Sequence, residues 1–335
     1  MKKYWIHNKG FDLTFIISPP FLVLGFVLLF QNKIKYWQEN YSFFTWLFLI
    51  VFIDVAHVYA TLYKTYFNKN GRNYFGKQLF YVPLFCFGLG LFLYGLGYQV
   101  FWSTLAYVAV FHFIRQQYGF MRLYAKNEEK SIRWMDNIVI YNATVYPMLF
   151  WFFSPKRQFT WFVENEFVGF TSKTIVQLTT ILYFLIIITY VGYVIFRVLK
   201  YKECNIPKYL LMLGTYISWY FGIVYFDNDL IFTLLNVISH GIPYMALIYI
   251  NQKTENHLNV LPKLSTLKGV FVFVCLFIFL AVFEEFLWEI FVWNENISVF
   301  ENVSRFEEWH ILVVPLLMVP QFTHYILDGI IWKKQ

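Results

Sequence analysis

Ten apolar segments of about the length needed to cross a lipid bilayer dominate this 335-residue chain. They lie at approximately 11–30, 41–63, 79–95, 99–121, 138–153, 175–197, 209–226, 229–250, 268–288 and 310–332. Backbone polar groups in lipid must be satisfied within the structure that crosses it, and a helix of about 20 residues does this over ~30 Å of hydrocarbon. We therefore expect an all-α polytopic integral membrane protein with about ten transmembrane helices, forming one transmembrane helical domain over residues 1–335.

The composition favours the lipid bilayer over water as the solvent of the apolar side chains. The chain is 59% hydrophobic and 14% charged, whereas about 25% of the residues of an average soluble domain are charged. Its net charge of +7 is spread over the predicted loops instead of forming a basic patch, so we expect no nucleic-acid partner. The three cysteines are isolated, which argues against a disulfide framework and against a cysteine metal motif.

The basic residues predict an orientation. If the amino terminus is cytoplasmic, 20 of the 27 Lys and Arg residues fall in inside segments and 6 in outside segments. Cytoplasmic loops of membrane proteins carry such an excess of Lys and Arg. We expect an integral protein of a membrane resembling the bacterial inner membrane, with both termini in the cytoplasm.

Four of the seven histidines lie inside the apolar segments. They are His57, His112, His240 and His324. Strongly polar groups are costly in hydrocarbon and are by default a sign of function, and imidazole is a good ligand for iron, copper and zinc. All four fall in even-numbered segments, 7 to 13 residues before the next cationic loop or tail residue. This corresponds to about 10–20 Å along a helix, so the four rings are predicted to share one layer and bind one metal ion.

Polar neighbours of these histidines are candidate catalytic or orienting residues. Asp54 and His57 are three residues apart, and His324 and Asp328 are four apart, so each pair shares a helix face. A carboxylate commonly accepts the second N–H of a metal-bound histidine, so Asp54 and Asp328 could orient the rings, or either could bind the metal directly. Arg115 and Gln116 share a face with His112 in the same way.

Other polar residues are also candidates for contacts with the site. Those that could contact the site are Tyr59, Gln117, Tyr244 and Gln321, and the remaining histidines, predicted to be solvated at helix ends or in loops, are His7, His257 and His310. Glu284, Glu285 and Glu289 are predicted to begin an acidic outer loop.

Imidazole ligands with nearby carboxylates suit Fe(II), with copper or zinc as alternatives. A haem held by two histidines is possible in principle, but four rings in one layer exceed what one haem needs. A site within the bilayer also suits a hydrophobic small-molecule substrate that enters from lipid, such as a polyene, a fatty chain or a quinone.

Two stretches resemble a known family. FHFIRQQYGF around His112 and VPQFTHYILDG around His324 are similar to segments of the Brp/Blh-type membrane carotene dioxygenases. SHGIP at His240 resembles a His-Gly element that this family places nearer its amino terminus. The resemblance implies a polytopic non-haem iron protein with the four histidines as iron ligands, and a carotenoid substrate.

The sequence thus predicts a membrane oxidoreductase that acts with dioxygen on a lipid-soluble substrate, and it does not indicate the electron donor. An alternative from another class is a proton-coupled multi-pass transporter. Its proton relay would consist of Asp54, His57, His112, Arg115, His324 and Asp328. A third alternative is an accessory subunit that only binds partner helices.

Overall fold

The structure, a computed structural model, describes residues 4–128, 133–255, 261–293 and 307–332. These residues are 82% helix and contain no strand, which confirms the all-α prediction. His257 lies outside the described residues.

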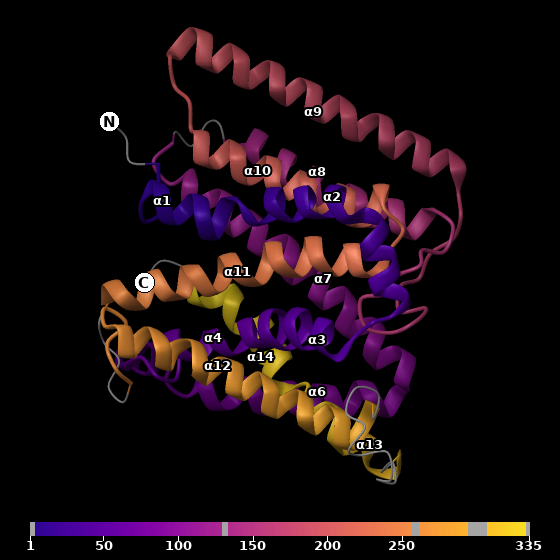
Figure 1. Ribbon diagram of the computed structural model, residues 1–335, viewed down its shortest axis with the longest axis vertical. Coiled ribbons are helices and arrows are strands. Elements are labelled where there is room, and N and C mark those ends of the chain that lie inside the picture. The colour runs from indigo at the N-terminus through magenta and orange to yellow at the C-terminus, as the bar shows by residue number, and fades with distance from the viewer. Residues whose placement is uncertain (1–3, 129–132, 256–260, 294–306, 333–335) are drawn as a thin grey trace. The chain divides into compact units, whose positions relative to one another are not determined.

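The chain divides into two compact units, and Figure 1 labels most of their helices. Unit 1 comprises residues 1–40 and 110–243, and unit 2 comprises residues 41–109 and 244–335. Unit 1 contains α1 (Lys9–Phe11), η1 (Asp12–Ile17), α2 (Pro19–Glu39), the end of α7 (Tyr98–Tyr124), α8 (Arg133–Phe153), α9 (Lys173–Tyr201), α10 (Ile206–Trp219), η4 (Tyr220–Tyr225) and the start of α11 (Asp229–Glu255). Unit 2 contains α3 (Phe43–Trp46), η2 (Leu47–Val55), α4 (Ala56–Lys64), α5 (Lys69–Phe75), α6 (Gln78–Leu96), the rest of α7 and α11, α12 (Leu267–Trp288), η5 (Glu289–Trp293), η7 (Glu307–Trp309), α13 (His310–Leu317) and α14 (Val319–Ile331). The expectation of a single domain stays a prediction.

Helices occupy all ten predicted segments, but fewer of them have the character of a membrane span. Among the described residues, six helices are long and apolar enough to cross a membrane: 43–64, 78–96, 173–201, 229–254, 267–293 and 310–331. A seventh results if 9–17 and 19–39, which are bent by 51° relative to each other, count as one span. The other predicted spans correspond to α7, α8 and α10–η4. None of these three is among the helices that are both long enough and apolar enough to cross a membrane. The remaining three of the ten predicted spans therefore stay a prediction.

Unit 1 encloses an ion network at the start of α10. The Lys208 ammonium lies 2.7 Å from a Glu128 carboxylate oxygen and 3.0 Å from one of Asp136, and the Lys208 side chain is 2% exposed. The Tyr190 hydroxyl of α9 also donates to Asp136. Asn205 caps α10 and donates to Glu128. The network joins α8, α9 and α10 to Glu128, which lies shortly after the end of α7.

A second cation, Arg157, closes the end of η4. Its Nη2 donates to three backbone carbonyls, those of Ile223, Val224 and Phe226. Carbonyls at a helix end lack partners within the helix, so the guanidinium replaces the missing donors. Burial lowers the pKa of Arg157, and the nearby Asp227 carboxylate opposes this shift.

In unit 2, the last span is broken into α13 and α14. The break falls at Met318, and Pro320 follows in the first turn of α14. Proline lacks an N–H and prefers the start of a helix, so the sequence explains why α14 begins here. His324 and Asp328 both lie on α14.

The three glutamates near the end of α12 are buried, contrary to the prediction of an outer loop. Glu284, Glu285 and Glu289 are 7%, 9% and 1% exposed, and the helix continues through them into η5. Glu284 accepts hydrogen bonds from the Tyr59 hydroxyl (2.5 Å) and from the Trp288 indole. The prediction was wrong because partners on a neighbouring helix allow polar groups to remain inside a helix bundle.

Candidate metal centre

His57 and His324 lie side by side in unit 2. Their ring centroids are 5.0 Å apart, with the ring planes at 82°, and the residues are 0% and 1% exposed. His57 is in the first turn of α4, immediately after the π-helical η2. π-Helical turns are rare and frequently occur at functional sites.

Two hydroxyls and a carboxylate connect to the His324 ring. The Thr61 hydroxyl lies 2.7 Å from Nδ1 of His324 and 2.9 Å from the Tyr244 hydroxyl. Tyr244 also hydrogen-bonds to Asp328, which accepts a 2.8 Å bond from the Trp332 indole. With Thr61 at Nδ1, Nε2 is the His324 nitrogen suited to a metal ion.

Sequence reasoning named Tyr244 and Asp328 but missed Thr61. The signal was its position four residues after His57, on the same face of α4. Tyr244 contacts both rings of the pair, with centroid distances of 5.9 Å to His57 and 5.1 Å to His324.

Asp54 is adjacent to His57 but does not hold its ring at hydrogen-bond distance. Its Oδ1 is 3.8 Å from Nδ1 of His57, which is too long for a hydrogen bond. The Asp54 side chain is 27% exposed, whereas that of His57 is fully buried. A role for Asp54 and Asp328 in orienting the rings stays a prediction.

His112 and His240 form a second pair, in unit 1. Their ring centroids are 5.1 Å apart with the planes at 77°, and the residues are 4% and 1% exposed. Phe113 stacks on the His240 ring at 3.6 Å with an interplanar angle of 4°. Phe113 belongs to a buried aromatic cluster that includes Trp219 and Phe232, so the ring plane of His240 is fixed by the core of unit 1.

Arg115 and Gln116, three and four residues after His112 on α7, point in different directions. Gln116 is buried, and its Nε2 donates to the backbone carbonyl of His240 at 2.9 Å. It therefore positions α11 against α7. Arg115 is exposed, donates to the Tyr141 hydroxyl and lies over the Tyr118 ring. The structure thus does not bring Arg115 to the buried His112 ring, because three residues turn a helix about 60° away from the same face.

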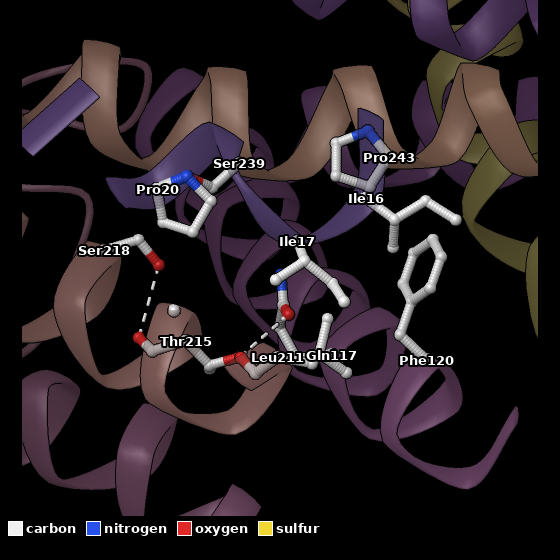
Figure 2. Close-up of a pocket in the computed structure, with 11 residues that line it drawn as sticks. Ile16, Ile17, Pro20, Gln117, Phe120, Leu211, Thr215, Ser218, Ser239 and Pro243 are labelled. Atoms are coloured by element: carbon white, nitrogen blue, oxygen red, sulfur yellow. Dashed lines mark hydrogen bonds between the residues drawn. The ribbon is translucent and has the colours of Figure 1, made fainter. Parts of the chain in front are cut away.

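The remaining candidates make contacts of their own. Tyr59 donates to Glu284, and Gln321 donates to the Tyr325 hydroxyl. Gln117 accepts from Thr215 and lines a hollow of about 10 Å³ together with Ser239, the residue before His240 (Figure 2). A hollow of this volume is about the size of one water molecule, so it is too small for an organic substrate.

Taken together, the four histidines form a group that could hold a metal ion. All four are buried, and one ring nitrogen from each lies within 4.8 Å of the others. Metal–imidazole bonds measure about 2.0–2.1 Å, so ligands on opposite sides of one ion stand roughly 4.2 Å apart. The separations among the four ring nitrogens are of this order.

No family model matches this chain, and neither the curated proteins nor the solved structures contain a match. The chemistry of the site must therefore be argued from its own residues.

Proposed function

We propose that this protein is a membrane-embedded oxidoreductase in which His57, His112, His240 and His324 bind one iron ion. The observation that carries the proposal is the convergence of four buried ring nitrogens within 4.8 Å. The donor set suits Fe(II), with copper or zinc as alternatives, because imidazole binds all three.

The residues around the rings fit a resident metal ion. Thr61 occupies Nδ1 of His324, and Phe113 fixes the plane of His240. Such contacts set the tautomer and orientation of metal-binding rings. Burial of all four rings keeps water from competing for the ion.

Iron held by these four imidazoles would supply the capacity to activate dioxygen. Several long apolar helices favour a substrate that reaches the site from lipid, and the resemblance of the sequences around His112 and His324 to carotene dioxygenases favours a polyene. A fatty chain or a quinone fits the same reasoning. The side chains of this protein would bind and orient such a molecule and exclude water.

Metal analysis of purified protein tests this proposal. After expression in metal-replete medium, we expect about one iron per chain, and a His57→Gln, His324→Gln variant should lose it. His7→Gln is the matched control, because His7 packs on Phe11 and belongs to neither histidine pair. Protein that contains no iron, copper or zinc in a stoichiometric amount would end the proposal.

The proton-transporter alternative is distinguished by a second measurement. Its relay included Arg115, which lies on an exposed side of α7. The oxidoreductase should consume dioxygen when given a lipid-soluble polyene in detergent, without any membrane gradient. Proton flux into vesicles that is unaffected by metal removal would instead favour the transporter.

A further inference from the structure

A large apolar groove opens between α9 and α10 of unit 1. Its volume is about 480 Å³, within the usual range of about 300–1,000 Å³ for small-molecule sites. Residues that line it include Tyr183, Tyr190, Tyr209, Met212, Tyr216 and Tyr220. α9 packs against α8, and Figure 1 shows it on the outer side of α8 and α10.

Two of the tyrosines that line the groove have hydroxyls that bind the protein. The Tyr190 hydroxyl donates to Asp136, and the Tyr216 hydroxyl donates to the backbone carbonyl of Val139. Asn142 in turn donates to Tyr216. A ligand in this groove therefore meets mainly apolar atoms, as an acyl chain would.

The outer side of α9 is apolar and largely exposed. This helix is a candidate span of which only 11% of the most apolar window is buried. Leu185, Ile188 and Leu199, which do not line the groove, are all more than half exposed. In a membrane such a surface contacts lipid tails, so the groove is open to lipid.

Cations continue the groove at the end of α9. Arg197 lies seven residues after Tyr190, which lines the groove. A spacing of seven returns to nearly the same helix face, so Arg197 lies on the face of α9 that lines the groove. Lys202 is the residue that ends α9, in a left-handed backbone conformation. Lys202 is exposed, whereas Arg197 is paired with Glu203 at 2.8 Å through one guanidinium nitrogen, which leaves its other donors for an anion.

We propose that this groove binds one anionic phospholipid, with an acyl chain along the tyrosine rings and the phosphate at Arg197 and Lys202. Charge complementarity selects this occupant: basic pockets between membrane helices bind anionic lipid headgroups. The site uses no residue of the histidine pairs, so it is independent of the proposed metal chemistry.

Native mass spectrometry of full-length protein in detergent tests the headgroup contact. Dioleoylphosphatidylglycerol and dioleoylphosphatidylcholine are offered separately. We expect about one retained phosphatidylglycerol per chain, and at least tenfold less in an Arg197→Gln, Lys202→Gln variant. The matched control is Lys33→Gln, Lys35→Gln, because both lysines are exposed on α2 of the same unit. Equal retention of the two lipids, or an equal loss in the control, would overturn the proposal.

A groove-filling variant tests the acyl-chain contact. Val191→Trp places an indole at a groove-lining position and should also reduce retained phosphatidylglycerol at least tenfold. Ile188→Trp, on the same helix but outside the lining, should have no effect. If Val191→Trp removes lipid while the charge variant retains it, the occupant is an apolar molecule without a recognised phosphate, and the proposal fails. It also fails if no lipid is retained and chains cross-link to one another through the groove. Thermal unfolding of each variant verifies that it is folded.

Discussion

At the scale of single residues, Thr61 is the clearest example of a side chain whose role depends on its neighbours. Its hydroxyl lies between Nδ1 of His324 and the Tyr244 hydroxyl, and Tyr244 hydrogen-bonds to Asp328. A carboxylate can therefore influence the imidazole through two hydroxyls. Contacts of this kind raise metal affinity because they hold a ring in its binding tautomer.

Replacing Thr61 by valine should weaken metal binding without removing a ligand. We expect the metal affinity to fall about 10- to 100-fold, and Thr61→Ser should retain most of it. Competition with a chelator of known affinity measures the effect. Thr65→Val is the control, because the Thr65 hydroxyl donates only to the Thr61 carbonyl among its described bonds. An unchanged affinity in Thr61→Val would show that the hydroxyl does not orient the ring.

A second residue-scale prediction concerns Lys208. Lys208→Met leaves Asp136 buried without its cation, and breaking a buried pair costs about 3–5 kcal/mol. The thermal unfolding temperature should fall markedly. Adding Asp136→Asn and Glu128→Gln should recover part of the loss, since no buried charge then lacks a partner. If the single variant is as stable as the original protein, the network contributes specificity and not stability.

The four histidines could be found from the sequence because a polar ring is conspicuous in an apolar run. Their ring contacts could not. Threonine and phenylalanine are common in membrane helices, so nothing singled out Thr61 or Phe113 before the rings were placed. The exposure of Arg115 shows the limit of face arguments, since a residue one turn away can still point outward.

At the scale of helices, hydropathy predicted ten segments that are all helical in the structure, and Pro320 explains the break at Met318. The segment 310–332 is one apolar run in the sequence but two helices in the structure. Hydropathy failed for Glu284, Glu285 and Glu289, because it treats each charged residue as the end of a span. It contains no information on Tyr59, which lies 225 residues away in the sequence and supplies the hydrogen bond.

Close packing of α6 on α13 gives an element-scale prediction. A Cβ at Gly90 would lie 3.0 Å from Cβ of Pro315, so the two helices approach closely at this glycine. Gly90→Leu should lower the free energy of unfolding by about 1–3 kcal/mol through overpacking. Gly88→Leu on the same helix is the control, because a Cβ there meets nothing within 4 Å. Equal unfolding temperatures for the two variants would contradict the packing argument.

At the scale of the whole molecule, the distribution of charge predicts an orientation that geometry does not test. Most Lys and Arg residues fall on the side assigned to the cytoplasm. Within the described part of the chain, hydropathy supports six spans and a bent seventh. α7, with His112, is less apolar because it carries polar side chains such as Gln116 and Gln117. A helix that is covered by protein needs less hydropathy than one in contact with lipid.

Cysteine labelling tests this orientation. Cys204, which follows α9, is exposed and lies in a segment predicted to be cytoplasmic. In a Cys86→Ser, Cys275→Ser background, a membrane-impermeant maleimide should label it in inverted vesicles and not in intact cells. A single cysteine introduced by Lys33→Cys, with Cys204 also replaced, should behave in the opposite way. Labelling of both positions from the same face would refute the predicted topology.

The buried end of α12 has a consequence for how this chain is made. If the protein enters a membrane as proposed, the carboxyl groups of Glu284, Glu285 and Glu289, at the end of α12 and the start of η5, would enter it during biosynthesis. An isolated acidic side chain at the centre of a membrane helix costs about 2.5–3.5 kcal/mol on insertion. The Tyr59 hydroxyl that receives Glu284 is synthesised far earlier. We therefore expect α4 to be integrated first and to serve as an internal chaperone for the late insertion of α12.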